Sequence, residues 1–269
     1  MRLVGHHALI TGGGTGIGAA TAHALAAEGA RVTLVGRRLE PLEQTANRIR
    51  SSRTKSIDAG TEAGRRPSTS LGMKEVFCCT ADVTARAEVD RAFSDARETN
   101  GPISILINNA GAASGAPFGK ISETLWRDML AVNLDSMFHC CQAALPDLLG
   151  AERGRIVTVA SMAGLHGFAY AAPYIAAKHG AVGLTRALAA EFARTPLTAN
   201  AVCPGFVDSD MTVQSIANII SKTGRSEDQA LAELARLNPS GRLIAPEEVA
   251  AVTLDLILSD RNGEAVEIA

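Results

Sequence analysis

The sequence predicts an α/β fold in which a doubly wound parallel sheet of about seven strands carries helices on both faces. Three observations predict it: short apolar runs alternate with longer helical runs, a glycine-rich turn joins the first run to the first helix, and polar residues follow several of the runs. Such alternation is typical of a parallel sheet with right-handed helical crossovers. The 269 residues suit one large domain with an ample core.

The expected strands are short apolar runs: residues 7–10, 31–35, 75–80, 103–107, 155–160, 197–202 and a short last run at 265–268. Runs of helical character lie between them, at residues 17–27, 41–49, 86–99, 123–149 and 174–194. One polar stretch, residues 51–73, lacks either periodicity, and its composition favours a flexible insertion away from the ligand end of the sheet. We therefore expect a single domain over residues 1–269.

Composition and charge argue against several classes of protein. The net charge is −2, the pI is about 6.3 and aromatic residues make up 4%, which disfavours a nucleic-acid partner. The chain shows neither a transmembrane run nor the apolar core of a signal peptide, so we expect no membrane partner and a cytoplasmic location. Five cysteines lie in apolar runs and six histidines lack partners at ligand spacing, so we expect reduced thiols and no metal site.

A glycine-rich turn, TGGGTGIG, follows the first strand and opens the first helix. Glycines let the backbone turn tightly and approach a pyrophosphate, whose charge the helix N-terminus meets. The spacing differs from the common G-x-G-x-x-G, but its place between a strand and a helix predicts a dinucleotide site. The residues expected to contact the dinucleotide here are Gly12, Thr15, Gly16, Ile17 and Gly18.

The end of the second strand indicates which dinucleotide binds. A NAD-selective site carries Asp or Glu here for the ribose 2′-hydroxyl, whereas this strand ends in Arg37 and Arg38. Two guanidinium groups suit a 2′-phosphate, so the sequence favours NADP(H), with NAD(H) as the alternative. The other interpretation is that both arginines are solvated surface charges.

Polar and small residues also follow the third and fourth strands. Asp82 and Val83 follow the third strand and are placed to address the adenine. The segment Asn109-Ala110-Gly111 follows the fourth and would let the backbone run close under the adenosine half.

Tyr174 and Lys178 form the pair of residues that carries the most chemical information. They are four residues apart in a helical run, with Ser161 thirteen residues upstream at the end of an apolar strand. Positions i and i+4 share a helix face, and a fixed cation beside a phenol favours the phenolate, lowering a pKa that is near ~10 in water. Such a tyrosine serves as a general acid or base at a carbonyl or alcohol. The other tyrosine, Tyr170, has no lysine at i+4.

These residues, taken in order, resemble the short-chain dehydrogenase/reductase family over nearly the whole chain. The set comprises TGGGTGIG, Asp82, NNAG, Asn133, Ser161, Tyr174, Lys178, Pro204-Gly205 and Thr212. The resemblance implies a single Rossmann-type domain with a seven-stranded parallel sheet. It also implies a homotetramer or homodimer.

The resemblance implies a role for each of four catalytic residues. Tyr174 would protonate the carbonyl oxygen as hydride arrives from the nicotinamide, and Ser161 would donate to the same oxygen. Lys178 would lower the pKa of the tyrosine and bind the nicotinamide ribose. Asn133 would hold a water that links Lys178 to solvent; the alternative is a buried amide that satisfies backbone groups.

The family pattern also implies contacts from the segment after the sixth strand. Pro204, Gly205 and Val207 would embrace the nicotinamide carboxamide, and Thr212 would aid the phosphates. The stretch 208–239 would form a helical lid over the substrate. Its basic residues, Lys222, Arg225 and Arg236, could meet substrate phosphates or be ordinary surface charges.

Within the family, residues 172–180 and 200–207 look most like 3-oxoacyl-thioester reductases, including aromatic-polyketide ketoreductases and 3-oxoacyl-carrier-protein or acetoacetyl-CoA reductases. The leading hypothesis is therefore an NADP(H)-dependent oxidoreductase that interconverts a 3-oxoacyl thioester and its 3-hydroxyacyl form. The alternative is the same catalyst acting on a free ketone or secondary alcohol, such as a cyclic ketone, sugar or steroid. A non-catalytic dinucleotide sensor is a third hypothesis, which the complete set of catalytic residues disfavours.

Overall fold

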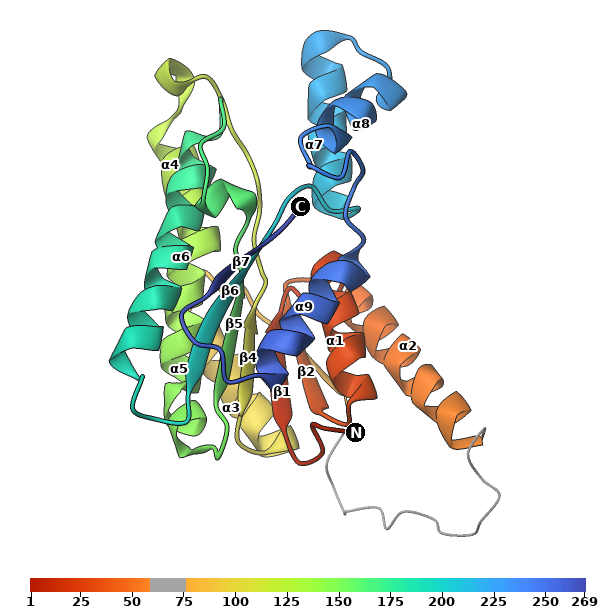
Figure 1. The fold of residues 1–269 in the computed structure, drawn as a ribbon, viewed down its shortest axis with the longest axis vertical. Helices are drawn as coiled ribbons and strands as arrows, with labels where there is room; N and C mark the ends of the chain where they lie inside the picture. The colour runs from red at the N-terminus through yellow and green to blue at the C-terminus, as the bar shows by residue number, and fades with distance from the viewer. Residues whose placement is uncertain (59–75) are drawn as a thin grey trace.

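Seven parallel strands form one central sheet in the computed structural model, which describes residues 1–58 and 76–269 (Figure 1). The strands are β1 (His7–Thr11), β2 (Arg31–Gly36), β3 (Val76–Thr80), β4 (Ile105–Asn108), β5 (Arg155–Val159), β6 (Thr198–Pro204) and β7 (Ala265–Ile268). Their order is β3-β2-β1-β4-β5-β6-β7, and all neighbours pair in parallel. The direction of winding reverses between β1 and β4, and open α/β sheets bind ligands beyond the carboxyl ends of such strands. The predicted doubly wound fold is confirmed.

Helices cover both faces of the sheet (Figure 1). One face carries α1 (Gly16–Ala27), α2 (Leu39–Asp58) and α9 (Pro246–Leu258), and the other carries α3 (Arg86–Asn100), α5 (Ser136–Gly150) and α6 (Ala172–Glu191). In β1, the side chains of Ala8 and Ile10 pack into the hydrophobic core on one face of the sheet, whereas that of Leu9 packs into the core on the other face. Because successive side chains of a strand face opposite sides, strands buried on both faces read as continuous apolar runs. This is why the sequence revealed them.

Three features of the helices differ from the sequence-based expectation. The helix α9 was not expected, although Pro246 opens it and the Glu248 carboxylate accepts the N–H of Ala245 at 2.7 Å. The helix α2 runs to Asp58, so the first part of the expected insertion 51–73 is helical, and residues 59–73 lie outside the described residues. The expected helix 123–149 is divided into α4 (Glu123–Leu130), a π-helical turn η2 (Ala131–Asp135) and α5.

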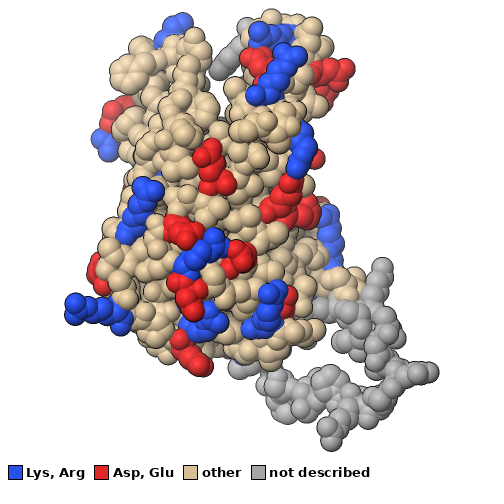
Figure 2. Space-filling view, in the orientation of Figure 1, with Lys and Arg blue, Asp and Glu red and all other residues tan. Residues whose placement is uncertain are grey.

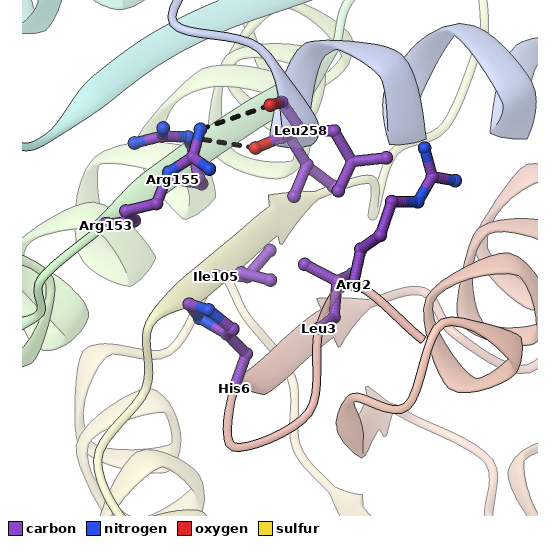
Figure 3. Close-up of a pocket in the computed structure, with 8 residues that line it drawn as sticks. Arg2, Leu3, His6, Ile105, Arg153, Arg155 and Leu258 are labelled. Atoms are coloured by element: carbon purple, nitrogen blue, oxygen red, sulfur yellow. Dashed lines mark hydrogen bonds between the residues drawn. The ribbon is translucent and has the colours of Figure 1, made fainter.

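A cluster of basic residues at the amino ends of the strands fixes α9 to the sheet (Figure 3). Arg155 is 3% exposed and donates to the carbonyl oxygens of Ile257 (3.0 Å) and Ser259 (3.2 Å) at the end of α9. Arg153 and Arg155 also share the carboxylate of Asp260. Cations are favourable at the C-terminus of a helix, where carbonyl groups lack intrahelical partners. These arginines therefore act as structural ties, at the end of the sheet opposite the ligand end.

His7 is expected to make the fold sensitive to acid. Its ring is fully buried, with Nδ1 2.7 Å from the carbonyl oxygen of Gly101 and Nε2 2.8 Å from the Thr33 hydroxyl. Burial lowers its pKa to about 4, whereas an unfolded histidine titrates near ~6.5. The unfolded chain therefore binds the proton preferentially, and about 3 kcal/mol of stability should be lost as the pH falls from roughly 6.5 to 4. Urea unfolding of the protein and of His7→Gln at several pH values checks this, because equal pH dependence in the two would contradict it.

Candidate active site

Tyr174, Lys178 and Ser161 meet beyond the carboxyl end of β5. Pro173 lies in the first turn of α6, so the helix begins just before Tyr174 and places Lys178 one turn later. Lys178 is 5% exposed, and its Nζ lies 5.7 Å from the centroid of the Tyr174 ring and donates to the Val159 carbonyl oxygen at 3.0 Å. The Ser161 side chain lies close enough to the Tyr174 hydroxyl to lower its pKa. The structure thus brings the three predicted residues together.

Ser161 is held by the short 3-10 helix η3 (Met162–Gly164) that follows it. Its Oγ accepts the N–H of Ala163 at 3.1 Å, so the hydroxyl caps this helix. The strand β5 ends at Val159, one residue earlier than expected, and this leaves Ser161 just past the edge of the sheet. The backbone of Ser161 also lies close to the buried thiol of Cys203 at the end of β6 and lowers its pKa. Ser161 therefore lies against the ends of two neighbouring strands, β5 and β6.

The pKa of Tyr174 differs from the sequence-based expectation. Burial raises the pKa of Tyr174, and the Ser161 side chain beside its hydroxyl offsets part of that rise. Burial lowers the pKa of Lys178 to about 8. The expected lowering of the tyrosine pKa by Lys178 is not found, because the ammonium lies near the ring and donates to Val159 rather than to the phenol oxygen. A neutral phenol keeps its proton at neutral pH, which suits a proton donor.

Asn133 lies in the π-helical turn between α4 and α5 and is 4% exposed. Its Nδ2 donates to the carbonyl oxygens of Ala112 (2.9 Å) and Met129 (3.1 Å), and its Oδ1 accepts the Ala112 N–H at 3.3 Å. A Cβ on Gly111 would lie 2.8 Å from Asn133 Oδ1 and 3.6 Å from Lys178 Nζ. Asn133 thus satisfies backbone groups, as the alternative interpretation held, and Gly111 lies beside both Asn133 and Lys178. Its role in a water relay stays a prediction.

The glycine-rich turn leaves no room for side chains beside the loop after β4. A Cβ on Gly18 would lie 2.2 Å from the Gly12 carbonyl oxygen and 2.6 Å from Asn109 Nδ2, and Gly12 itself has a φ of +64°. Asn109 Nδ2 donates to the carbonyl oxygens of Thr11 (2.9 Å) and Gly12 (3.1 Å). Thr15 makes no side-chain cap for α1, and the first turn holds no acidic residue. The open N-terminus and the closely packed glycines fit the pyrophosphate of NAD(P).

The remaining predicted residues near the turn lie around its rim. The Ala110 N–H donates to Thr11 Oγ at 3.0 Å, which fixes the loop after β4. Ile17 packs against the core, and Gly16 has a φ of +51° and faces Ser209 before α7 (Asp210–Thr223). The turn therefore lies close to the base of the predicted lid.

Arg37 and Asp82 line a hollow beyond the carboxyl ends of β2 and β3, while Val83 is buried in the core. Asp82 Oδ1 accepts the N–H and the hydroxyl of Thr84, and these bonds lower the pKa of its carboxyl group. Arg37 and Arg38 are exposed, and neither forms an ion pair with any residue that the structure describes. A second guanidinium, from Arg91 of α3, lines the hollow together with that of Arg37. Sequence reasoning missed it because it lies on the flank of a helix with no motif around it.

The segment after β6 and the start of α7 hold four of the residues predicted to contact the cofactor. Val207 is 5% exposed and Gly205 donates its N–H to the Ile268 carbonyl oxygen at 2.8 Å, just after Pro204 ends β6. The Thr212 hydroxyl donates to the Val207 carbonyl oxygen at 2.6 Å. This bond uses its only hydrogen, so in this conformation Thr212 braces the loop and does not offer a donor to a phosphate.

The predicted lid, residues 208–239, contains α7 and α8 (Glu227–Ala235). The two helices pack through Ile216, Ala230 and Leu234, with Phe206 from the segment after β6 joining the cluster. Arg225 pairs with Glu233 of α8, and Arg236 is exposed. A cleft separates the lid from the part of the molecule that carries α4 (Figure 2).

Three properties of the described residues bear on other classes of site. No group of His, Cys, Asp or Glu among them could hold a metal ion. Within the same ranges, no helix is long and apolar enough to cross a membrane. All five cysteines are free, and four are buried. Burial raises the pKa of Cys203 to about 11 and that of Cys141 to about 12, so neither thiol is reactive at neutral pH.

Fold and site together define a class of enzyme, the NAD(P)-dependent oxidoreductases that act on CH–OH and C=O groups. The chain belongs to the short-chain dehydrogenase family, whose model, described as short chain dehydrogenase, matches residues 6–63 and 56–219.

Similar proteins include ketoacyl reductases and hydroxybutyrate dehydrogenases. A protein of Streptomyces violaceoruber described as a ketoacyl reductase of the granaticin polyketide synthase is 36% identical over 255 residues, covering 94% of this chain and 86% of the relative. A D-beta-hydroxybutyrate dehydrogenase of Cupriavidus necator is 34% identical, covering 94% of this chain and 91% of the relative. The crystal structure of a variant of actinorhodin polyketide ketoreductase with NADPH matches with a TM-score of 0.87 and 32% identity, covering 98% of this chain and 95% of that one.

Proposed function

We propose that the protein is an NADP(H)-dependent reductase of 3-oxoacyl thioesters, which forms the 3-hydroxyacyl product. The observation that carries the proposal is the convergence of Ser161, Tyr174 and Lys178 beyond the end of β5, next to Gly111 of the loop that packs on the glycine-rich turn. Similarity to ketoreductases of polyketide synthases supports the choice of substrate.

In the proposed reaction, side chains of the protein transfer the proton to the carbonyl oxygen. When bound, NADP(H) supplies a hydride for the carbonyl carbon. Tyr174 gives its proton to the carbonyl oxygen, and Ser161, whose side chain lies beside the Tyr174 hydroxyl, orients that oxygen. The Lys178 ammonium lies 5.7 Å from the ring and stabilises the phenolate that the transfer leaves. Asn133, held by the backbone of Ala112, keeps the loop beside Lys178 in place.

The substrate is tested by comparing acetoacetyl-CoA with free acetoacetate, which share a ketone but differ in the group beyond it. Similarity to a D-beta-hydroxybutyrate dehydrogenase favours a free acid as the second candidate. We expect NADPH absorbance to fall with acetoacetyl-CoA and much more slowly with acetoacetate. The reverse order would establish the second candidate, and turnover of neither, nor of cyclic ketones, would refute both.

Arg37→Asp is expected to shift cofactor preference toward NADH. Arg37 is exposed at the end of β2 and free to meet a 2′-phosphate, whereas a carboxylate would repel it. A charge-assisted hydrogen bond contributes about 1.5–3 kcal/mol, so the ratio of kcat/KM for NADPH to that for NADH should fall roughly 10- to 100-fold. Steady-state kinetics with both cofactors measures the ratio. Arg48→Asp, an equal charge change at an exposed position of α2, is the control, and an unchanged ratio in Arg37→Asp would refute the assignment.

We also propose a homodimer or homotetramer that uses α5. Phe138 and Leu149 on this helix are 45% and 38% exposed, which is high for large apolar side chains. Ala177 and Ala181 of α6 are fully buried within the chain. They pack against residues of the same subunit, so we do not include them in the proposed interface. Light scattering of the protein and of Phe138→Asp tests the interface.

A further inference from the structure

Asn238, just after α8, joins the lid to the segment after β6 by an unusually complete set of hydrogen bonds. Its side chain is 1% exposed. Oδ1 accepts the Phe206 N–H at 2.8 Å, while Nδ2 donates to the carbonyl oxygens of Phe206 (2.8 Å) and Arg242 (2.6 Å). The amide therefore bonds both backbone groups of one residue, as a neighbouring strand would. Only this orientation satisfies it, because a flipped amide would set an oxygen against two carbonyls.

The backbone segment that Asn238 bonds, residues 205–207, is closely packed. A Cβ on Gly205 would lie 2.2 Å from Asn238 Oδ1 and 3.0 Å from Met162 Sδ, so the amide, the segment and the helix after Ser161 are in close contact. The Phe206 ring packs into the lid cluster, and Thr212 braces Val207 from the other end of the lid. Both ends of the lid are thus bonded to residues 205–207.

We propose that Asn238 is a positioning residue that couples the lid to the nicotinamide-binding segment. The inference rests on the proposed function, because it takes residues 204–207 as the segment that the family resemblance assigns to the nicotinamide carboxamide of NADP(H). Asn238 holds the Phe206 backbone in the conformation that receives the nicotinamide. Without the amide, the segment and the lid move independently and the cofactor binds more weakly.

Asn238→Asp is the most informative variant, because it keeps the shape of the side chain and removes the hydrogen-bond donor Nδ2. Its carboxylate would face the carbonyl oxygens of Phe206 and Arg242 without a hydrogen, and acceptors in such contact repel. Protonation restores one O–H donor, so the defect should diminish as the pH falls. Other titratable or charged groups nearby are the Arg242–Glu248 pair, the exposed Arg236, Asp208 and the His166–Glu267 pair.

The experiment measures NADPH affinity by fluorescence between pH 5.5 and 8 for the unmodified protein, Asn238→Asp, Asn238→Ala and Asn218→Asp. The last is the matched control, an exposed asparagine on α7 whose change leaves the segment untouched. At pH 7.5 we expect Asn238→Asp and Asn238→Ala to lose at least tenfold in affinity. At pH 5.5 the aspartate variant should recover most of the loss relative to the unmodified protein, and the alanine variant should not.

Hydrogen exchange of the cofactor-free proteins gives a second, independent measurement. The Phe206 amide and the α7–α8 segment should exchange at least tenfold faster in Asn238→Asp at pH 7.5, with the rest of the sheet unchanged. Unchanged exchange, or an affinity loss that is equal at every pH, would overturn the inference while leaving the proposed function intact. Failure of the unmodified protein to bind NADPH would instead refute the proposed function, and the exchange result would still decide whether Asn238 holds the segment.

Discussion

Replacing Tyr174 with phenylalanine is expected to lower kcat for ketone reduction by roughly 10²–10⁴-fold, the usual contribution of a positioned general acid. The substitution removes one hydroxyl, which lies beside the Ser161 side chain, and leaves the ring beside Lys178. NADPH affinity should therefore remain nearly unchanged. Stopped-flow absorbance measures turnover, and fluorescence titration measures the affinity.

Tyr170→Phe is the matched control for this experiment, because it makes the same change four residues away. Tyr170 is 70% exposed and has no lysine at i+4, so its hydroxyl takes no part in the proposed proton transfer. Loss of activity in both variants would point to a general effect of removing a tyrosine hydroxyl. Retained activity in Tyr174→Phe would exclude this residue as the acid.

Replacing Lys178 with methionine is expected to reduce turnover about 100-fold or more and to remove the alkaline limb of the pH profile. Because burial lowers the pKa of Lys178 to about 8, the ammonium is present below that pH and is lost above it. The rate of reduction should therefore be flat up to about pH 8 and fall beyond it in the unmodified protein. Tyr174 does not limit this range, since burial raises its pKa above that of an exposed tyrosine.

The folded protein should tolerate this substitution, which separates catalysis from stability. A lysine whose pKa falls on folding disfavours the folded state at neutral pH, and methionine relieves this effect. The lost bond to the Val159 carbonyl opposes the gain, so the midpoint of thermal unfolding should change by only a few degrees. Lys120→Met, at an exposed position, is the control for loss of a positive charge. An unaltered alkaline limb in Lys178→Met would contradict the assignment.

The sequence predicted the sheet closely because the strands β1, β2, β4, β5 and β6 are almost wholly buried and so read as apolar runs. It placed Tyr174, Lys178 and Ser161 correctly because two are linked by helical spacing and the third follows a strand. It missed α9, although Pro246 and Glu248 mark its start. The sequence therefore contained the signal for the start of this helix, although it was not recognised.

Other features depend on contacts that no local pattern encodes. The π-helical turn at Asn133 places its amide against Ala112, 21 residues away, and spacing does not reveal this. The raised pKa of Tyr174 depends on how deeply the pair is buried, whereas spacing gives only adjacency. Thr212 and Asn238 likewise owe their roles to partners in the segment after β6, and Asn238 lies 32 residues from Phe206.

The central claim, that Tyr174 delivers a proton to a carbonyl beside the nicotinamide, is tested most directly by a crystal structure with NADP⁺ and an unreactive 3-oxoacyl thioester analogue. The account predicts that Tyr174 Oη and Ser161 Oγ both lie within about 3 Å of the ketone oxygen. A complex in which the Tyr174 hydroxyl points away from the nicotinamide, with the ketone held by other groups, would contradict it.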